Sequence, residues 1–403
     1  MKKLFITSLI AFILLACTDN KDEKKTTSSV EVTQISSPAA DSCAEPFLFT
    51  DKNGLVYLSW IEKKGKISSL KSSTLSNDKW SAPMTIASGN NWFVNWADYP
   101  LIASVGNKNL LAHFLEKSDS AKFTYDVKII SSADSGKSWS QPKVLHEDKV
   151  KAEHGFVSII PYNDQFFVCW LDGRKTANEE NADGHGGHHG EMTLRAALID
   201  KNGNKINEWE LDGKVCDCCQ TSAAITSDGP VVVYRDRSDD EIRDMSIVRY
   251  VNGKWTIPKT IHADNWQIKA CPVNGPRIDA IKNNLAIAWF SMRDKKGQVN
   301  MAFSHDGGAT LRESIRIDEG KPIGRIDIAL LDSATAMVSW MEGSSIKAVK
   351  VYSDGKKNSS ILIASSSETR SSGFPQMTKS GNKMIFAWTD DKEKTIKVAS
   401  ISL

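Results

Sequence analysis

Residues 56–60 read VYLSW, and a short apolar run of this kind, ending in an aromatic residue, occurs seven times along the chain. The aromatic residues are Trp60, Phe114, Trp170, Tyr234, Trp289, Trp340 and Trp388. Consecutive copies are 54, 56, 64, 55, 51 and 48 residues apart. An acidic residue stands two positions after the aromatic one in every copy but the fifth, where Ser291 takes its place. Repetition at this spacing is typical of a fold that uses one supersecondary unit per copy.

The residues around each copy predict four β-strands per repeat. An apolar run and a turn precede the copy, as in PQMTKSGNK (375–383), and an alternating run follows it, as in TIKVASIS (395–402). Period-two alternation, β-branched residues and Gly/Asn/Asp turns indicate strands. The prediction is an all-β, seven-bladed β-propeller over residues 30–403, with a six-bladed ring as the alternative. Because the last copy ends after its third strand, we expect VEVTQIS (30–36) to close blade seven.

The N-terminus carries the features of an export signal. Lys2 and Lys3 precede an apolar run that is too short to span a bilayer, which predicts a signal peptide over residues 1–16. The run ends in LLAC (14–17), which resembles the lipobox of bacterial lipoproteins and implies lipidation of Cys17. An ordinary secretory signal with a chance cysteine is the alternative. Residues 17–29 are polar and predict a flexible tether.

These features predict a protein of the bacterial cell envelope, attached by its lipid to the outer membrane on the periplasmic or surface side. The formal charge is +2, and removal of Lys2 and Lys3 leaves 2 − 2 = 0. This balance gives no reason to expect nucleic acid as a partner. We expect a monomer whose partners are the membrane, through the lipid, and a glycan or an envelope protein.

In a propeller, the loops between blades share one face with the loops that join second and third strands. The stretch KVCDCCQT (214–221) begins blade four, and Cys271 begins blade five at the equivalent place. We therefore expect the thiols of Cys216, Cys218, Cys219 and Cys271 to lie close together. Cys43 belongs across the ring, and Cys169 is expected to be a buried apolar residue.

Three interpretations of the four cysteines remain open. One is a disulfide from Cys271 to a member of the trio, which would link blades four and five. The second is a metal site of Cys216, Cys218, Cys219 and Cys271, completed by His154, because thiolate and imidazole suit copper(I) or zinc. The third is a redox-active thiol pair. The stretch HGGHHG (185–190) is a separate metal hypothesis, with a solvated loop as its alternative.

Two turns resemble the Asp-box, or BNR, repeats of sialidases. They are SADSGKSW (132–139) and SHDGGATL (304–311). The resemblance implies a structural role on the face opposite any active site for Ser132, Asp134, Gly136, Trp139, Ser304, Asp306 and Gly308. Stretches such as NWADYP, EHGFVS and CPVNGP also resemble bacterial proteins labelled exo-α-sialidase.

The resemblance implies a second function, glycoside hydrolysis of the exo-α-sialidase type. Sialidases hold the substrate carboxylate with three arginines and use a Tyr–Glu pair with an Asp. The catalytic candidates are Asp98, Glu153, Arg174, Arg235 and Arg237. The sequence lacks an arginine motif on the first strand, where EPFLF (45–49) stands. For Arg174, a structural ion pair with Asp172 is the alternative. The leading hypothesis is therefore metal or ligand binding at a Cys/His/Asp/Arg site.

Overall fold

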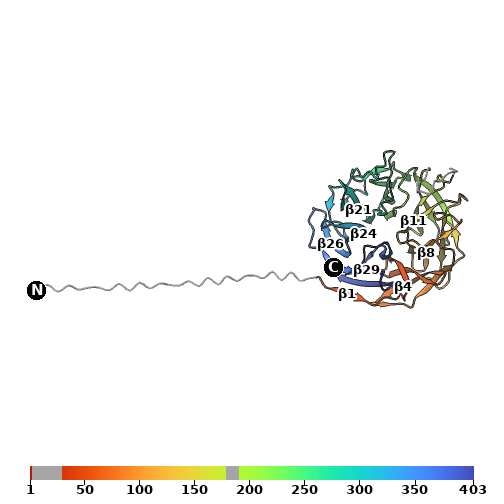
Figure 1. The fold of residues 1–403 in the computed structure, drawn as a ribbon, viewed down its shortest axis with the longest axis horizontal. Helices are drawn as coiled ribbons and strands as arrows, with labels where there is room; N and C mark the ends of the chain where they lie inside the picture. Colours follow the sequence, from red (N-terminus) through yellow and green to blue (C-terminus); the bar gives the residue numbers. More distant parts are fainter. Residues whose placement is uncertain (2–29, 178–189) are drawn as a thin grey trace. The chain divides into compact units, whose positions relative to one another are not determined.

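Each copy of the repeat forms one antiparallel sheet, and the sheets stand as blades around a central axis (Figure 1). The computed structural model describes residues 1, 30–177 and 190–403, and within them seven such sheets are present. The seven-bladed prediction is confirmed, and the six-bladed alternative is wrong. The signal peptide, the tether with Cys17, and the histidines of HGGHHG lie outside the described residues.

Blades one to four contain the following strands. Blade one has β2 (Cys43–Thr50), β3 (Val56–Lys64), β4 (Ile67–Ser76), β5 (Lys79–Trp80) and β6 (Met84–Gly89). Blade two has β7 (Ile102–Val105), β8 (Asn109–Lys117), β9 (Tyr125–Ser132) and β10 (Lys143–Val144). Blade three has β11 (His154–Tyr162), β12 (Gln165–Asp172), β13 (Thr193–Ile199) and β14 (Lys205–Asp212). Blade four has β15 (Ser222–Ile225), β16 (Pro230–Arg235), β17 (Met245–Val251), β18 (Lys254–Trp255) and β19 (Lys259–Thr260).

Blades five to seven complete the ring. Blade five has β20 (Arg277–Ile281), β21 (Asn284–Arg293), β22 (Lys296–Ser304) and β23 (Ile315–Arg316). Blade six has β24 (Pro322–Asp332), β25 (Thr335–Glu342), β26 (Ser345–Tyr352) and β27 (Ile361–Ser365), and a 3-10 turn, η1 (Arg370–Ser372), follows it. Blade seven has β28 (Gln376–Ser380), β29 (Lys383–Asp390), β30 (Thr395–Ser402) and, from the start of the chain, β1 (Val32–Ile35).

The ring closes by pairing the two ends of the propeller. Strand β1 runs antiparallel to β30, with Val32 opposite Ile401 and Ile35 opposite Val398. This pairing confirms the predicted closing strand. It covers the outer edge of β30, which would otherwise present unpaired backbone groups.

The repeated aromatic residue is buried in the second strand of each blade, and in blades three and six the repeated acid accepts its indole N–H. The indole N–H of Trp170 donates to Asp172 over 2.8 Å. Trp289 lies in blade five, where Ser291 replaces the acid, and its N–H donates to Asp264 from the preceding loop over 2.8 Å. A buried N–H group needs an acceptor, and this need accounts for the acid in blades three and six, whereas the Trp60 N–H in blade one has no such partner.

The first Asp-box-like turn, at residues 132–139, is closed by hydrogen bonds to its serine and aspartate side chains. The Asp134 carboxylate accepts the Ser132 hydroxyl over 2.9 Å and the Ser138 N–H over 2.9 Å. Gly136 adopts a φ of 83° and donates its N–H to the Ser132 hydroxyl. The Trp139 ring packs against a hydrophobic cluster of blades one and two. Hydrogen bonds from Ser138 lower the pKa of Asp134 to about 2.

The second turn repeats this arrangement and fixes the face on which both lie. Asp306 accepts the Ser304 hydroxyl over 2.7 Å, and Gly308 donates to Ser304 with a φ of 87°. The neighbouring Gly307 N–H donates to Asn283 in the turn between β20 and β21. The two Asp-box-like turns therefore lie beside the turns that join first and second strands.

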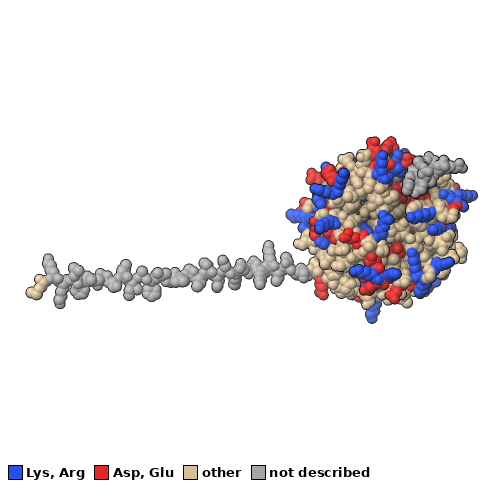
Figure 2. Space-filling model, in the orientation of Figure 1, with Lys and Arg blue, Asp and Glu red and all other residues tan. Residues whose placement is uncertain are grey.

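The opposite end of the ring is called the site face below. There, the start of a first strand pairs with the end of a second strand, as in Cys43 with Glu62 and His154 with Asp172. The loops between blades thus lie beside the loops that leave second strands, as predicted. Basic and acidic side chains are interspersed over the surface seen in Figure 2. In the described part of the chain, no helix has the length and apolar character needed to cross a membrane.

Candidate metal centre

Four thiols gather on the site face where blade four begins. The Sγ atom of Cys216 lies 3.7 Å from that of Cys219 and 3.8 Å from that of Cys218. The three sulfur atoms are all within 4.8 Å of one another. Cys218 also belongs to a second group of that size with Asp217 and Cys271. Cys218 therefore joins the trio of blade four to the cysteine of blade five.

The cluster is graded from buried to exposed. Cys216 and Cys219 are 1% and 2% exposed, Cys218 is half-buried and Cys271 is exposed. Burial raises the pKa of the Cys216 thiol to about 11. Burial alone would also raise the pKa of Cys219, but hydrogen bonds from the Cys216 and Cys218 thiols and the charge of Arg235 hold that pKa well below its ordinary value. Of the cluster thiols, Cys219 is thus the one whose surroundings most favour deprotonation.

Two arginines place positive charge beside the sulfur atoms, Arg243 at Cys216 and Arg235 at Cys219. The Arg243 guanidinium donates to the Cys216 sulfur over 3.2 Å and lies 3.5 Å from Asp217. Its other edge binds Glu241 over 2.7 Å. Positive charge beside a thiol favours the thiolate. Arg243 was not among the sequence-predicted site residues.

Arg235 has a structural role. It is 2% exposed and donates to the backbone oxygens of Asn274, Arg243 and Phe290 over 2.7, 2.6 and 2.8 Å. Its guanidinium also lies 4.8 Å from the centre of the Trp266 ring. These contacts join blades four and five directly behind the cysteine cluster.

A polar cleft of about 460 Å³ leads to the cluster from solvent. Its walls include Asp217, Arg237, Glu241, Arg243, Lys269 and Cys271. Cys271 is thus the cysteine of the cluster that lines the cleft, and the Arg243 side chain, which donates to the Cys216 sulfur, forms part of the same wall.

Two of the predicted catalytic acids are buried near the thiols. The Tyr125 hydroxyl donates to Glu153 over 2.7 Å, and burial raises the pKa of Glu153 to about 8. Asp98 accepts the Phe156 N–H over 2.9 Å, and burial raises the pKa of Asp98 to about 7. Gly155 is required here, because a Cβ atom on it would lie 2.1 Å from the Asp98 carboxylate. Both acids support the start of blade three from inside.

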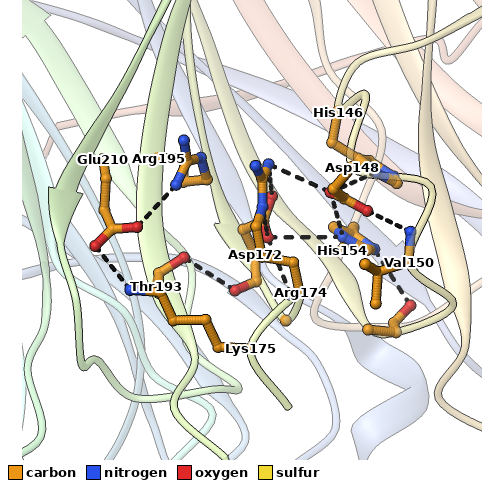
Figure 3. A network of polar contacts seen from close by, with 12 residues as sticks. His146, Asp148, Val150, His154, Asp172, Arg174, Lys175, Thr193, Arg195 and Glu210 are labelled. Atoms are coloured by element: carbon orange, nitrogen blue, oxygen red, sulfur yellow. Dashed lines mark hydrogen bonds and ion pairs between the residues drawn. The ribbon is translucent and has the colours of Figure 1, made fainter. Parts of the chain in front are cut away.

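The structure places His154 away from the thiols, in contrast to the predicted ligand set. Its ring stacks on His146 with centroids 3.5 Å apart, and its Nε2 lies 3.2 Å from Asp148. Among the described residues, its ligand atoms group with Asp126 and His146, or with Asp148 and Asp172, and not with a cysteine. His154 therefore belongs to a second polar cluster, shown in Figure 3.

The other candidate arginines are also engaged by protein groups. Arg174 binds Asp172 through two bonds of 2.7 Å and lies 3.2 Å from Glu208. Arg237 pairs with Glu241 over 2.7 Å. The ion pair of Arg174 with Asp172 matches the structural alternative. All three candidate arginines thus bind groups of the protein itself.

The remaining predicted cysteines lie elsewhere. Cys169 is fully buried near Thr221, and burial raises the pKa of its thiol to about 12. Cys43 is 1% exposed at the start of blade one, and burial raises the pKa of its thiol to about 11.

Comparison of the sequence with known protein families and with curated proteins gives no match. Among solved structures, the polysaccharide lyase Uly1 is similar, with a TM-score of 0.52 and 9% identity over 89% of this chain and 90% of the lyase. The phage phi92 endosialidase has a TM-score of 0.49 and 11% identity over 93% of this chain and 69% of that one. The Hadza microbial sialidase Hz136 has a TM-score of 0.43 and 14% identity over 74% of this chain. The matched region covers 63% of the length of that sialidase.

At these identities the likeness concerns the fold alone. The fold and the site together define an all-β, seven-bladed propeller with a cysteine cluster on its site face.

Proposed function

We propose that the chain is a metal-binding propeller lipoprotein of the bacterial cell envelope. Cys216, Cys218 and Cys219 supply three sulfur ligands, and Cys271 or Asp217 supplies the fourth. Thiolate ligands select zinc or copper(I) over the harder divalent ions. A metal site that is open to a cleft at Cys271 suits a protein that handles metal ions in the cell envelope or takes part in the assembly of an envelope protein.

The observation that carries the proposal is the spacing of the sulfur atoms. Separations of 3.7 and 3.8 Å join Cys216 to Cys219 and Cys218. Tetrahedral zinc, with zinc–sulfur bonds of about 2.3 Å, holds its sulfur ligands about 3.8 Å apart. The thiols therefore need little movement to bind one ion. The positive charges of Arg243 and Arg235 favour deprotonation of the thiols and offset the negative charge that three thiolates would bring.

The test measures metal and thiols on the same sample. The full-length protein is purified in detergent without an affinity tag, and zinc and copper are measured by elemental analysis. We expect about one ion per chain, in line with a structural thiolate site. We expect Cys218→Ser to lose the ion. Cys169→Ser, which changes a buried cysteine outside the cluster, is the control and retains it.

A disulfide or redox pair gives a different result. Peptide mapping without reductant would then find two of the four cysteines oxidised, and metal would be absent in every variant. That outcome contradicts the proposal. Protection of the four thiols from alkylation, lost on addition of a chelator, supports it.

The alternative is a sialidase-type glycoside hydrolase, which the resemblance of the Asp-boxes suggests. The contacts of Arg174, Arg235 and Arg237 with protein groups favour the metal proposal over it. Release of 4-methylumbelliferone from a sialoside tests it directly. We expect no turnover, and turnover that Arg237→Ala abolishes would restore the hydrolase.

A further inference from the structure

A pocket of about 760 Å³ lies at the axis of the ring, and none of the four cluster cysteines lines it. Its walls come from Leu101, which precedes the first strand of blade two, and from the first strands of the other six blades. Those strands are β2, β11, β15, β20, β24 and β28. The lining also includes Asp51 and the exposed Lys52, in the turn between β2 and β3. The pocket therefore reaches solvent at the end of the ring opposite the site face.

The side chain of Arg277 reaches from blade five to blades two and seven. Its Nη2 atom donates to the Tyr99 hydroxyl and, over 3.3 Å, to the side-chain oxygen of Gln376. Its Nε atom donates to the Ile326 carbonyl oxygen over 3.3 Å, and the Asp327 carboxylate lies 3.8 Å from the same nitrogen. All of these hydrogen bonds go to neutral oxygen atoms, so no acid directly neutralises the guanidinium by a hydrogen bond.

The Nη1 atom of this guanidinium is the informative one. Among the residues that the structure describes, none accepts a hydrogen bond from Nη1 of Arg277, and this atom is not buried. The more deeply buried Arg235 and Arg325 bond through both of their terminal nitrogens. The Arg277 side chain is 12% exposed and lines the pocket. Arg277 thus keeps a charged donor for a molecule in the pocket.

The acids of the pocket are engaged by backbone N–H groups. Asp51 accepts two of them within its own turn. Each oxygen of Asp279 and of Asp327 accepts one, and in both residues one of the two comes from the neighbouring blade. Burial raises the pKa of both acids, that of Asp279 to about 6. These carboxylates would repel a doubly charged anion, so the pocket favours a single negative charge.

The wall from blades one to three is largely apolar, with Phe47, Phe49, Leu101 and Ile160. We propose that the pocket binds a small monocarboxylate with an apolar body, and that its carboxylate pairs with Arg277. A hydrogen bond between two charged groups is stronger than one between neutral groups, and the apolar body gains by leaving water. The volume is within the range of small-molecule sites. This proposal does not depend on the metal site.

Three probes that share one ring test the charge of the ligand. Benzoate, benzamide and benzylamine carry a negative, a neutral and a positive head group, and each is titrated by calorimetry into the full-length protein in detergent. We expect benzoate to bind about tenfold more tightly than benzamide, and benzylamine to bind most weakly. Equal binding of benzoate and benzamide, a preference for benzylamine, or no binding of any probe would overturn the proposal.

A pair of variants tests the role of the arginine. We expect Arg277→Gln to lower the affinity for benzoate about tenfold, to the level of benzamide. Arg325→Gln is the matched control, because Arg325 is also buried and bonded to uncharged groups but does not line the pocket. The control should keep the affinity of the wild type. Unchanged affinity in Arg277→Gln contradicts the assignment.

Photolabelling locates the ligand in the wild-type protein and decides the matter even if Arg277→Gln fails to fold. The probe is 4-azidobenzoate, and labelled peptides are identified by mass spectrometry after irradiation. We expect the label on peptides that contain Phe47, Leu101 or Ile160, and its loss when benzoate is in excess. Label confined to peptides outside the pocket, or label that benzoate does not displace, would mean adventitious binding and would exclude this site. Removal of metal from the protein should change none of these results.

Discussion

The Nη1 atom of Arg243 lies 3.2 Å from the sulfur of Cys216, inside the wall between blade four and the cleft. An arginine that donates to a thiol in a buried place lowers the cost of deprotonating it. Arg243 therefore favours the Cys216 thiolate in opposition to burial, which raises the pKa of that thiol to about 11.

Arg243→Gln should weaken metal binding without removing a ligand. The substitution leaves Cys216, Cys218 and Cys219 in place but removes the positive charge beside them. We expect the metal affinity to fall about tenfold, and the pH at which the site is half loaded to rise. Competition with a chromogenic chelator at several pH values measures both. An unchanged pH profile would show that Arg243 only fills space.

Much of the fold could be predicted because propeller blades repeat their chemistry. An aromatic residue on the second strand, followed in six of the seven copies by an acid two positions later, recurs every 48 to 64 residues. The same repeat aligned Cys271 with Cys216, Cys218 and Cys219, although they are 52 or more residues apart. Topology was enough to bring these thiols together.

The structure does not place His154 with the cysteines, and the sequence contains the reason. Glu153 and His154 are adjacent at the start of a strand, and neighbouring side chains on a strand point to opposite faces. Glu153 contacts Tyr125 on the side of the thiols, and His154 contacts His146 on the other. The two residues cannot serve one site. The stretch HED (146–148), which begins eight residues upstream of His154, contains two residues that contact His154, and the sequence-based prediction did not use it.

The role of Arg235 could not be predicted from the sequence. Its partners are backbone oxygens, which every residue has, so no residue pattern reveals them. Arg235→Lys should therefore destabilise the protein by about 2–4 kcal/mol, since a lysine cannot reach three carbonyl groups and leaves some unsatisfied. Urea unfolding measures the change. Arg237→Lys, at a partly exposed ion pair with Glu241, is the control and should cost about 1 kcal/mol or less.

Strand β1 should be essential for closing the ring. Deletion of residues 30–36 exposes the edge of β30, so we expect a lower melting temperature and self-association. Size-exclusion chromatography and thermal unfolding detect these effects. Deletion of residues 22–28, which has the same length and falls in the predicted tether, is the control. A closed, monomeric ring that melts normally without residues 30–36 would contradict this role for β1.

Cys17→Ser tests the proposed lipid anchor. If the cysteine carries the lipid, wild-type protein should partition into detergent, and the variant should appear in the aqueous phase with its signal still attached or cleaved elsewhere. Labelling with a clickable fatty acid gives a direct readout. Cys43→Ser serves as the control, because that thiol is buried at the start of blade one. Equal labelling of wild type and Cys17→Ser would exclude lipidation at this position.

Asp98 should make the stability of the propeller depend on pH. Burial raises the pKa of Asp98 to about 7, above its value in the unfolded chain, so the folded state holds the proton more tightly. The stabilisation from the protonated form is complete below the unfolded pKa of 3.8 and is lost as the pH rises to about 7. Asp98→Asn stays neutral and retains an oxygen for the Phe156 N–H. Between about pH 5 and about pH 8, wild type should therefore lose about 1–3 kcal/mol more than the variant.

The comparison of wild type with Asp98→Asn measures this carboxyl together with its effect on Glu153. Glu153, whose pKa burial raises to about 8, titrates in the same range and is present in both proteins. The charge of Asp98 also raises the pKa of Glu153, so the difference between the two curves contains the titration of Asp98 together with its repulsion of Glu153. Urea unfolding at each pH gives the free energies. Parallel curves for the two proteins would mean that Asp98 is ionised in the folded state, and the Phe156 N–H would then outweigh burial in setting its pKa.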